Sequence, residues 1–280
     1  MDNIRINEET ISAFEAWLQS EEKSRGTKEK YLRDIRAYAA WLSGGEAGKV
    51  SACQWKEYLL GKNYAPVTVN SMISAVNSFF AFAGLPARIK FLRIQRSVFR
   101  EKARELTKEE FRRLVATAED QGKKRLALLL ETLCASGIRV SEVKYITVEA
   151  AQGGEARIAM KGKVRSILLP AKLCRKLLKY ARKQKIASGE IFLTRSGKSL
   201  SRNQIWTEMK RLAGDAGVEA TKVFPHNLRH LFATIFYRSY KDIIRLADIL
   251  GHSSVDTTRI YLATTGEEHR QMLERMKLVS

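Results

Sequence analysis

The chain is organised around Phe224-Pro225-His226-Asn227-Leu228-Arg229-His230, which is followed by Ile249-Leu250-Gly251-His252 and by Thr257-Thr258-Arg259-Ile260-Tyr261. Pro225 suits the first turn of a helix, where its missing N–H group would be unpaired anyway. His226 and Arg229 are three residues apart, so they share one face of that helix. We expect its buried face to consist of Leu228, Phe232, Ile235 and Phe236.

The second half of this stretch places two more polar residues beside the first helix. Gly251 directly after Leu250 predicts a helix end, which puts His252 in the turn beyond it. Tyr261 then lies on or beside a short helix that begins near Ser254. A single residue of this kind is usually structural, but four of them in one window indicate a shared site.

Composition bounds the class of protein. The chain has 280 residues, 45% of them hydrophobic, which is enough for two domains with separate cores. No apolar run approaches the length of a membrane span, so we expect a soluble protein with no membrane partner. The net charge of +20 comes from 50 basic and 30 acidic residues and is spread along the chain. Such a charge favours a polyanionic partner, and nucleic acid is the first candidate.

The cysteines and the first residues indicate the compartment. Cys53, Cys134 and Cys174 are scattered without a CxxC spacing, which argues against a disulfide framework and a zinc site. The N-terminus lacks the basic-then-apolar pattern of an export signal. We therefore expect a cytoplasmic protein with no metal and no cofactor.

Residues 1–86 predict a small four-helix domain. The helices begin near Glu8, Thr27, Ser51 and Pro66, each with apolar residues at helical spacing. The second helix carries basic residues that we expect to bind DNA, although a plain solvated face explains each of them equally well: Lys28, Lys30, Arg33 and Arg36.

Residues 87–104 predict a basic linker between two domains. Its basic residues recur every two to four positions with no acidic residue before Glu101, and we expect them to follow a phosphate backbone: Arg88, Lys90, Arg93, Arg96 and Arg100.

Residues 105–280 predict a second, mostly helical domain. Thr107-Lys108-Glu109-Glu110 is a capping box that starts it. The predicted helices cover about 108–119, 122–135, 140–146, 171–185, 202–216, 226–239, 241–250, 254–262 and 267–277. Residues 157–160 and 165–169 predict a β-hairpin around Lys161-Gly162-Lys163, and 191–193 suit a further short strand.

One more motif completes the set. Gly137 predicts the end of one helix, and Arg139 stands at the start of the next, where a helix N-terminus favours an anion. Along the chain, the motifs occur in this order: Gly137-Ile138-Arg139-Val140-Ser141-Glu142, a hairpin lysine, HxxR, LGH and a tyrosine. The chain therefore resembles the tyrosine recombinase, or phage integrase, family over nearly its whole length.

The resemblance implies a mainly α fold, with a four-helix core-binding domain and a mostly helical catalytic domain that contains a small β-sheet. It also implies roles for residues at matching positions. Arg139 and Arg229 match the two catalytic arginines, His226 and His252 the histidines, and Tyr261 the nucleophile. The hairpin lysine is Lys161, the acidic support is Glu142, and His230 matches a scaffold position.

The chemistry of these residue types agrees with those roles. Arginine is permanently charged and can bind two phosphate oxygens at once. A free phenol has a pKa of about 10, so Tyr261 needs a proton acceptor, for which His226 is suited. Attack by Tyr261 would give a 3′-phosphotyrosyl link and a free 5′ hydroxyl. That link conserves the bond energy, so rejoining needs no ATP.

The hairpin departs from the family pattern Gly-Lys-Gly-x-Lys-x-Arg, because Met160-Lys161-Gly162-Lys163-Val164-Arg165 is one residue shorter. Lys161 precedes the glycine and is favoured as the acid for the leaving oxygen, while Lys163 remains an alternative. We also expect Lys163 to contact DNA.

The resemblance implies a site-specific recombinase on double-stranded DNA, either a mobile-element integrase or an Xer-like enzyme. We expect a monomer in solution and a tetramer on a DNA synapse, with the segment after Glu267 docked on a neighbouring protomer. Two alternatives stay open at this point, namely a type IB topoisomerase and a catalytically silent DNA-binding protein.

Overall fold

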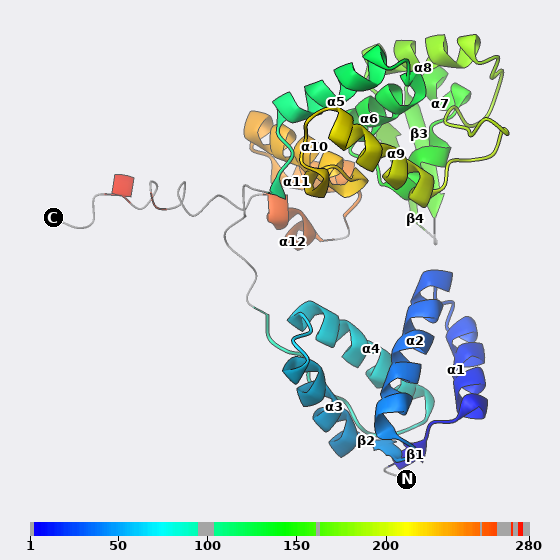
Figure 1. Ribbon diagram of the computed structural model, residues 1–280, viewed down its shortest axis with the longest axis vertical. Coiled ribbons are helices and arrows are strands. Elements are labelled where there is room, and N and C mark those ends of the chain that lie inside the picture. Colours follow the sequence, from blue (N-terminus) through cyan, green and yellow to red (C-terminus); the bar gives the residue numbers. More distant parts are fainter. Residues whose placement is uncertain are drawn as a thin grey trace. The chain divides into compact units, whose positions relative to one another are not determined.

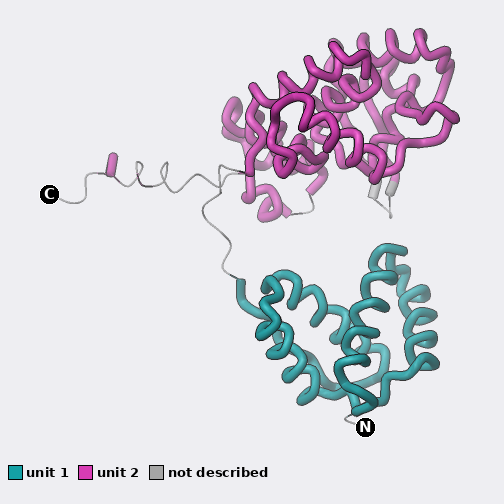
Figure 2. The backbone as a smooth tube through the Cα atoms, viewed as in Figure 1, with its two compact units in different colours: residues 1–96 teal, residues 97–280 magenta. Residues whose placement is uncertain are grey.

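The computed structural model describes residues 3–94, 104–160, 163–252, 254–261, 270 and 274–276, with only the backbone of Met160, Lys163 and Val164. The chain divides into two compact units, Met1–Arg96 and Ser97–Ser280 (Figure 2). Each unit has its own hydrophobic core. The mainly α fold predicted from the sequence is confirmed.

The first unit contains the four predicted helices (Figure 1): α1 (Glu8–Ser20), α2 (Arg25–Leu42), α3 (Lys49–Gly61) and α4 (Pro66–Phe82). Asn7 starts α1 with a reciprocal capping box to Thr10. Aromatic residues cluster in the core, where the rings of Phe14 and Phe79 meet edge to face with 5.3 Å between their centroids.

A two-stranded antiparallel sheet of β1 (Asn3–Arg5) and β2 (Glu46–Gly48) joins the start of the unit to the loop before α3. The sequence analysis did not predict it. Strands of three residues are too short to show the alternation by which a strand is recognised.

Residues 85–94 pack against α4 within the first unit. Two asparagines seven residues apart on α4 hold this segment, each through both the oxygen and the nitrogen of its side-chain amide. Asn77 binds the N–H and carbonyl of Ile89 at 2.8 and 3.0 Å, and Asn70 binds those of Leu92 at 2.7 and 2.9 Å. Ile89 is buried, whereas Arg88, Lys90 and Arg93 are exposed. The predicted domain limits stay predictions. Residues 87–94 of the predicted linker are held against α4.

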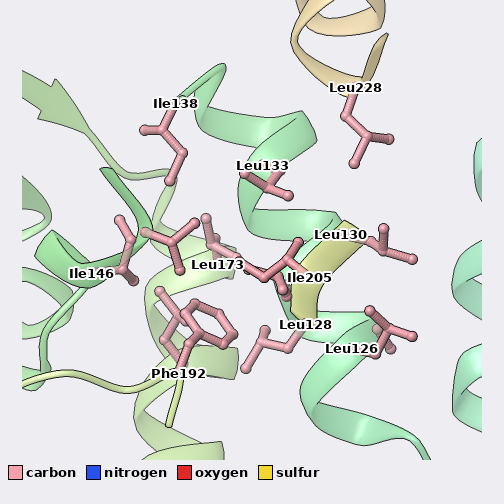
Figure 3. Packing of buried hydrophobic residues seen from close by; sticks show 14 of the residues in the cluster. Leu126, Leu128, Leu130, Leu133, Ile138, Ile146, Leu173, Phe192, Ile205 and Leu228 are labelled. Carbon is pink, nitrogen blue, oxygen red and sulfur yellow. The ribbon is translucent and has the colours of Figure 1, made fainter. Parts of the chain in front are cut away.

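The second unit is built around the helix α6 (Lys124–Ser136), which packs against α5 (Lys108–Asp120), α8 (Ala171–Lys183) and α10 (Pro225–Tyr240). Residues of α6 are buried on all sides, as expected of a central helix. Figure 3 shows Leu126, Leu128, Leu130 and Leu133 among side chains of surrounding elements, including Ile146, Leu173, Phe192, Ile205 and Leu228.

The remaining elements of this unit surround that core. They are η2 (Val140–Tyr145), α7 (Val148–Gly153), β3 (Glu155–Met160), β4 (Lys163–Leu168), α9 (Arg202–Asp215), η3 (Ala220–Lys222), α11 (Ile243–Leu250), α12 (Val255–Thr258) and η4 (Arg259–Tyr261). The predicted hairpin is confirmed, with Ile158 opposite Arg165 in its register.

Several local predictions for this unit were wrong. Residues 140–145 form a 3₁₀ helix, α7 was not predicted, and 254–262 divides into α12 and the 3₁₀ helix η4. Around 191–193 the structure has isolated bridges in place of a strand. On α10, Ile235 is 37% exposed, while Arg229 and Ala233 on another face are buried. The predicted helix at 267–277 lies mostly outside the described residues.

The described helices include none that is both long and apolar enough to cross a bilayer.

Candidate active site

Five of the sequence-predicted residues line one cavity of about 620 Å³ on the second unit: Arg139, His226, Arg229, His252 and Tyr261. They come from four places in the chain, namely the start of η2, the start of α10, the turn after α11, and η4. Residues of α9, among them Arg202 and Trp206, complete the wall.

Arg229 is the most deeply placed of these residues, at 2% exposure. It lies one turn into α10, and its guanidinium donates to the carbonyl oxygens of Gly137 at 2.5 Å and Leu250 at 2.7 Å. These carbonyls stand where α6 and α11 end, and helix ends leave carbonyl groups that need donors. Arg229 therefore ties two helix ends together beneath the cavity.

Burial lowers the pKa of Arg229 to about 10, with a further contribution from the charge of Arg139. The nearby Tyr261 side chain acts in the opposite direction through hydrogen bonding and charge. The guanidinium remains protonated at neutral pH. Arg139 and Arg229 repel each other, and an anion bound between them would relieve this repulsion.

His252 has partners on both ring nitrogens. Its Nε2 lies 3.0 Å from Nη2 of Arg229, and its Nδ1 lies 2.8 Å from Oγ1 of Thr258. Burial lowers the pKa of His252 to about 4, followed in size by the effects of Arg229 and Arg139. The imidazole is therefore neutral at physiological pH.

Tyr261 is 4% exposed and lies between two imidazoles. Its ring centroid is 4.6 Å from that of His230, nearly edge on, and 6.1 Å from that of His252, nearly parallel. His230 in turn lies 4.5 Å from His226, at right angles. His230, assigned a scaffold role from the sequence, is thus adjacent to both Tyr261 and His226.

Arg139 is held by Glu142 through two contacts. The carboxylate accepts from the backbone N–H of Arg139 at 2.7 Å and from its Nη1 at 3.1 Å. Glu142 is buried, while the side chain of Arg139 is 43% exposed. The carboxylate therefore fixes the orientation of this guanidinium, which stays partly exposed to solvent.

A third arginine in this cluster was missed by the sequence analysis. Arg165 on β4 contacts Glu142 at 2.5 Å. It occupies the last position of the hairpin motif Gly-Lys-Gly-x-Lys-x-Arg, so the sequence contained a signal for this residue. The sequence did not show that its side chain points towards Glu142.

The other predicted residues lie elsewhere or outside the described residues. Lys161, Arg96 and Arg100 fall outside them, and Lys163 is described only by its backbone, at the start of β4. On α2, Lys30 binds Asp34 and the carbonyl of Ser71. The other three basic residues on that helix also have neighbours: Lys28 contacts Gln19, Arg33 pairs with Asp34, and Arg36 lies 3.9 Å from Glu8.

Within the described part of the chain, no three histidine, cysteine or acidic side chains are grouped so that they could hold a metal ion.

Comparison with known proteins places this arrangement in a family. Residues 104–268 match the model of the phage integrase family, and residues 11–85 match the phage integrase N-terminal SAM-like domain. Tyrosine recombinase XerA of Thermococcus kodakarensis is 31% identical, over 97% of this chain and 96% of that protein. Tyrosine recombinase XerD of Xanthomonas axonopodis is 28% identical, over 89% and 90%.

Solved structures show the same fold. The crystal structure of XerA recombinase covers 97% of this chain and 99% of its own, with a TM-score of 0.54 and 23% identity. XerH bound to its difH substrate gives a TM-score of 0.67 at 18% identity, over 93% and 83%. A lambda integrase dimer bound to a COC′ core site gives 0.68 at 16%, over 91% and 94%. The predicted resemblance is confirmed, and the chain belongs to the phage integrase family of tyrosine recombinases.

Proposed function

We propose that this chain is a site-specific DNA recombinase that breaks and rejoins strands of double-stranded DNA through a phosphotyrosyl intermediate on Tyr261. The observation that carries the proposal is the position of the Tyr261 phenol beside the buried guanidinium of Arg229, in a cavity that Arg139 also lines. A nucleophile and two cations suited to phosphate thus occupy one site.

In the proposed mechanism, Arg139 and Arg229 bind the non-bridging oxygens of one phosphate. Their charges offset the negative charge on those oxygens as the transition state forms. Loss of one such donor typically reduces the rate about 100- to 1000-fold. His252 holds Arg229 by accepting from its Nη2, so at neutral pH it is a positioning residue and not an acid in this state.

The covalent step forms a bond between the Tyr261 oxygen and phosphorus and breaks the bond from phosphorus to the 5′ oxygen. The phenol proton passes to a histidine, and the 5′ oxygen gains a proton from a lysine of the β3–β4 hairpin, Lys161 or alternatively Lys163. His226 is the proposed acceptor. His230 is a second candidate, favoured by its ring lying 4.6 Å from that of Tyr261.

The proposed partner is double-stranded DNA, gripped by residues 1–86 and the basic segment 87–104 as well as by the catalytic region 105–280. The charge of +20 and the DNA-bound structures of XerH and lambda integrase support this partner. The named relatives are recombinases, which favours this activity over that of a topoisomerase. A cytoplasmic location is part of the same proposal.

We further propose that protomers assemble as a tetramer on a DNA synapse and are monomers in free solution. The second unit has an apolar groove of about 840 Å³, lined by residues that include Phe232, Phe236 and Tyr240. Such a groove suits the segment after Glu267, which has apolar residues at amphipathic spacing. Deletion of that segment should reduce assembly and recombination while leaving DNA binding largely intact.

Covalent capture tests the central claim. Protein is incubated with a pool of short duplexes that have a randomised centre, and adducts that survive denaturant are isolated and sequenced. The wild-type chain should form an adduct at a defined sequence through Tyr261, and Tyr261→Phe should bind the same duplex without forming one. An adduct with Tyr261→Phe, or none with the wild-type chain, would contradict the proposal.

A further inference from the structure

Arg165 is a part-buried cation outside the set of residues assigned above. It stands on β4 opposite Ile158, and its side chain is 17% exposed. Its Nη2 donates to Oε2 of Glu142 at 2.5 Å, and its Nη1 donates to the carbonyl of Ile249 at 3.3 Å. One side chain therefore connects the hairpin with η2 and with the last turn of α11.

The contact with Glu142 places one carboxylate between two arginines. Oε1 of Glu142 accepts from Nη1 of Arg139, while Oε2 accepts from the backbone N–H of Arg139 and from Arg165. Charged hydrogen bonds of this kind fix geometry strongly, because each partner is ionised and the group is removed from water. Without Arg165, one oxygen of this carboxylate would lose its charged donor and could turn away from Arg139.

The contact with α11 reaches the turn that carries His252. A Cβ atom built on Gly251 would lie 2.5 Å from both Cδ and Nη1 of Arg165. Arg165 therefore lies directly against the backbone of the turn, and a side chain at Gly251 would displace it. This turn precedes His252, which contacts Arg229.

Arg165 also holds its place at an energetic cost. Burial lowers the pKa of Arg165, and Glu142 opposes that effect. Its Nε is buried and has no hydrogen-bond partner within the described part of the chain. Removing a cation from water and leaving one of its donors unpaired both cost stability, and the charged contact with Glu142 offsets part of that cost.

We propose that Arg165 is a positioning residue for phosphate binding, which orients Arg139 through Glu142 and fixes the turn that carries His252. It does not touch the phosphate itself. This inference rests on the proposed function, since it assumes that Arg139 and Arg229 bind a phosphate undergoing cleavage.

The test measures single-turnover cleavage of the duplex recovered by covalent capture, together with its binding affinity and the melting temperature of each variant. Arg165→Met should bind DNA nearly as well as the wild-type chain and cleave about 10- to 100-fold more slowly, by analogy with the loss of a residue that orients a metal ligand. Arg165→Lys, which retains the charge, should recover part of the rate. Arg157→Met is the matched control, because Arg157 stands on the same hairpin with its side chain 82% exposed.

Two modified substrates separate positioning from general structural damage. A methylphosphonate at the cleavage site removes the phosphate charge that the arginines offset, so the deficit of Arg165→Met should shrink there, as should that of Arg139→Gln. A 5′-sulfur leaving group needs no acid and should leave the deficit of Arg165→Met unchanged. In the Glu142→Gln background, Arg165→Met should cost little more than Glu142→Gln alone.

Wild-type cleavage rates with Arg165→Met, an equal deficit on phosphodiester and methylphosphonate, or full rescue by the 5′-sulfur substrate would each overturn the inference. If Arg165→Met does not fold, Arg165→Lys provides the same comparisons. Failure of the proposed function is distinguishable, because the wild-type chain would then form no adduct with any duplex.

Discussion

Nη2 of Arg229 lies 3.0 Å from Nε2 of His252, and this contact fixes the protonation of the histidine. An arginine side chain only donates hydrogen bonds, so Nε2 must accept. The ring proton is therefore on Nδ1, which donates to Oγ1 of Thr258 at 2.8 Å. Protonation of Nε2 would break the contact and place a third positive charge beside Arg229 and Arg139.

The first prediction concerns stability as a function of pH. The pKa of His252 is about 4 in the folded chain and near its ordinary value of 6.5 when unfolded. Between these values the unfolded state binds more protons, so stability should fall as pH decreases from about 6.5 towards 4. His252→Asn lacks this contribution, and its free energy of unfolding should change less over that window.

Denaturant unfolding at several pH values measures this difference. Carboxylates also titrate near the lower end of the window, so the comparison is between the two proteins and not the absolute slope. Equal slopes for the wild-type chain and His252→Asn would contradict a neutral, part-buried His252.

The second prediction separates the two arginines. Arg229 is buried and binds two helix-end carbonyls, whereas the side chain of Arg139 is 43% exposed. Arg229→Gln should therefore lower the free energy of unfolding by about 1–3 kcal/mol, because buried carbonyls lose charged donors. Arg139→Gln should leave stability nearly unchanged.

Both substitutions should nevertheless reduce DNA cleavage about 100- to 1000-fold. Thermal melting and single-turnover cleavage on the captured duplex provide the two measurements. If Arg139→Gln lowered the free energy of unfolding as much as Arg229→Gln, the claim that only Arg229 supports the fold would be contradicted.

The third prediction uses two glycines that end helices in the left-handed conformation. Gly137 ends α6 with φ of 63°, and Gly154 ends α7 with φ of 72°. A Cβ on Gly137 would lie 2.6 Å from the ring of Phe232, whereas one on Gly154 meets nothing within 4 Å. Gly154→Ala should cost about 1–2 kcal/mol from backbone strain alone.

Gly137→Ala adds overpacking against Phe232, which should lower the free energy of unfolding by about another 1–3 kcal/mol. It should also reduce cleavage, because the carbonyl of Gly137 accepts from Arg229. Equilibrium unfolding of both variants decides the matter, and equal destabilisation would show that Phe232 moves aside without effect.

The outcome of the sequence analysis follows the range of the interactions involved. Helices with apolar periodicity and the hairpin depend on local sequence, and these predictions are confirmed. The short strands β1 and β2, the 3₁₀ conformation of η2 and the exposure of Ile235 depend on tertiary packing, which no window of sequence contains. The contact of Arg165 with Glu142 joins residues 23 positions apart, so this contact could be found only in the fold.

The motifs of the site were more informative than the periodicity. Arg139, His226, Arg229, His252 and Tyr261 do line one cavity, although they span more than 100 residues of sequence. The contact between His230 and Tyr261 was not predicted, because ring placement within a helix bundle depends on packing. The chemical roles of all these residues remain predictions.

The fourth prediction concerns the basic edge, defined as Arg88, Lys90 and Arg93. Asn70 and Asn77 fix the backbone between these residues by pairing with Leu92 and Ile89. Each phosphate contact releases counterions, which adds about 0.9 to the slope of log affinity against log salt concentration. Arg88→Gln with Arg93→Gln should lower affinity for the captured duplex and reduce that slope by up to about 2.

Positioning and charge can then be separated on the same edge. Asn70→Ala with Asn77→Ala retains every charge but releases the segment, so affinity should fall while the salt slope stays near that of the wild-type chain. Lys23→Gln with Arg25→Gln is the matched control, because these residues already have acidic partners in Glu21 and Glu29. Binding titrations over a range of salt concentrations measure both quantities. An unchanged slope in the double arginine variant would show that the basic edge does not contact phosphate, since a lost ionic contact must change the number of counterions released.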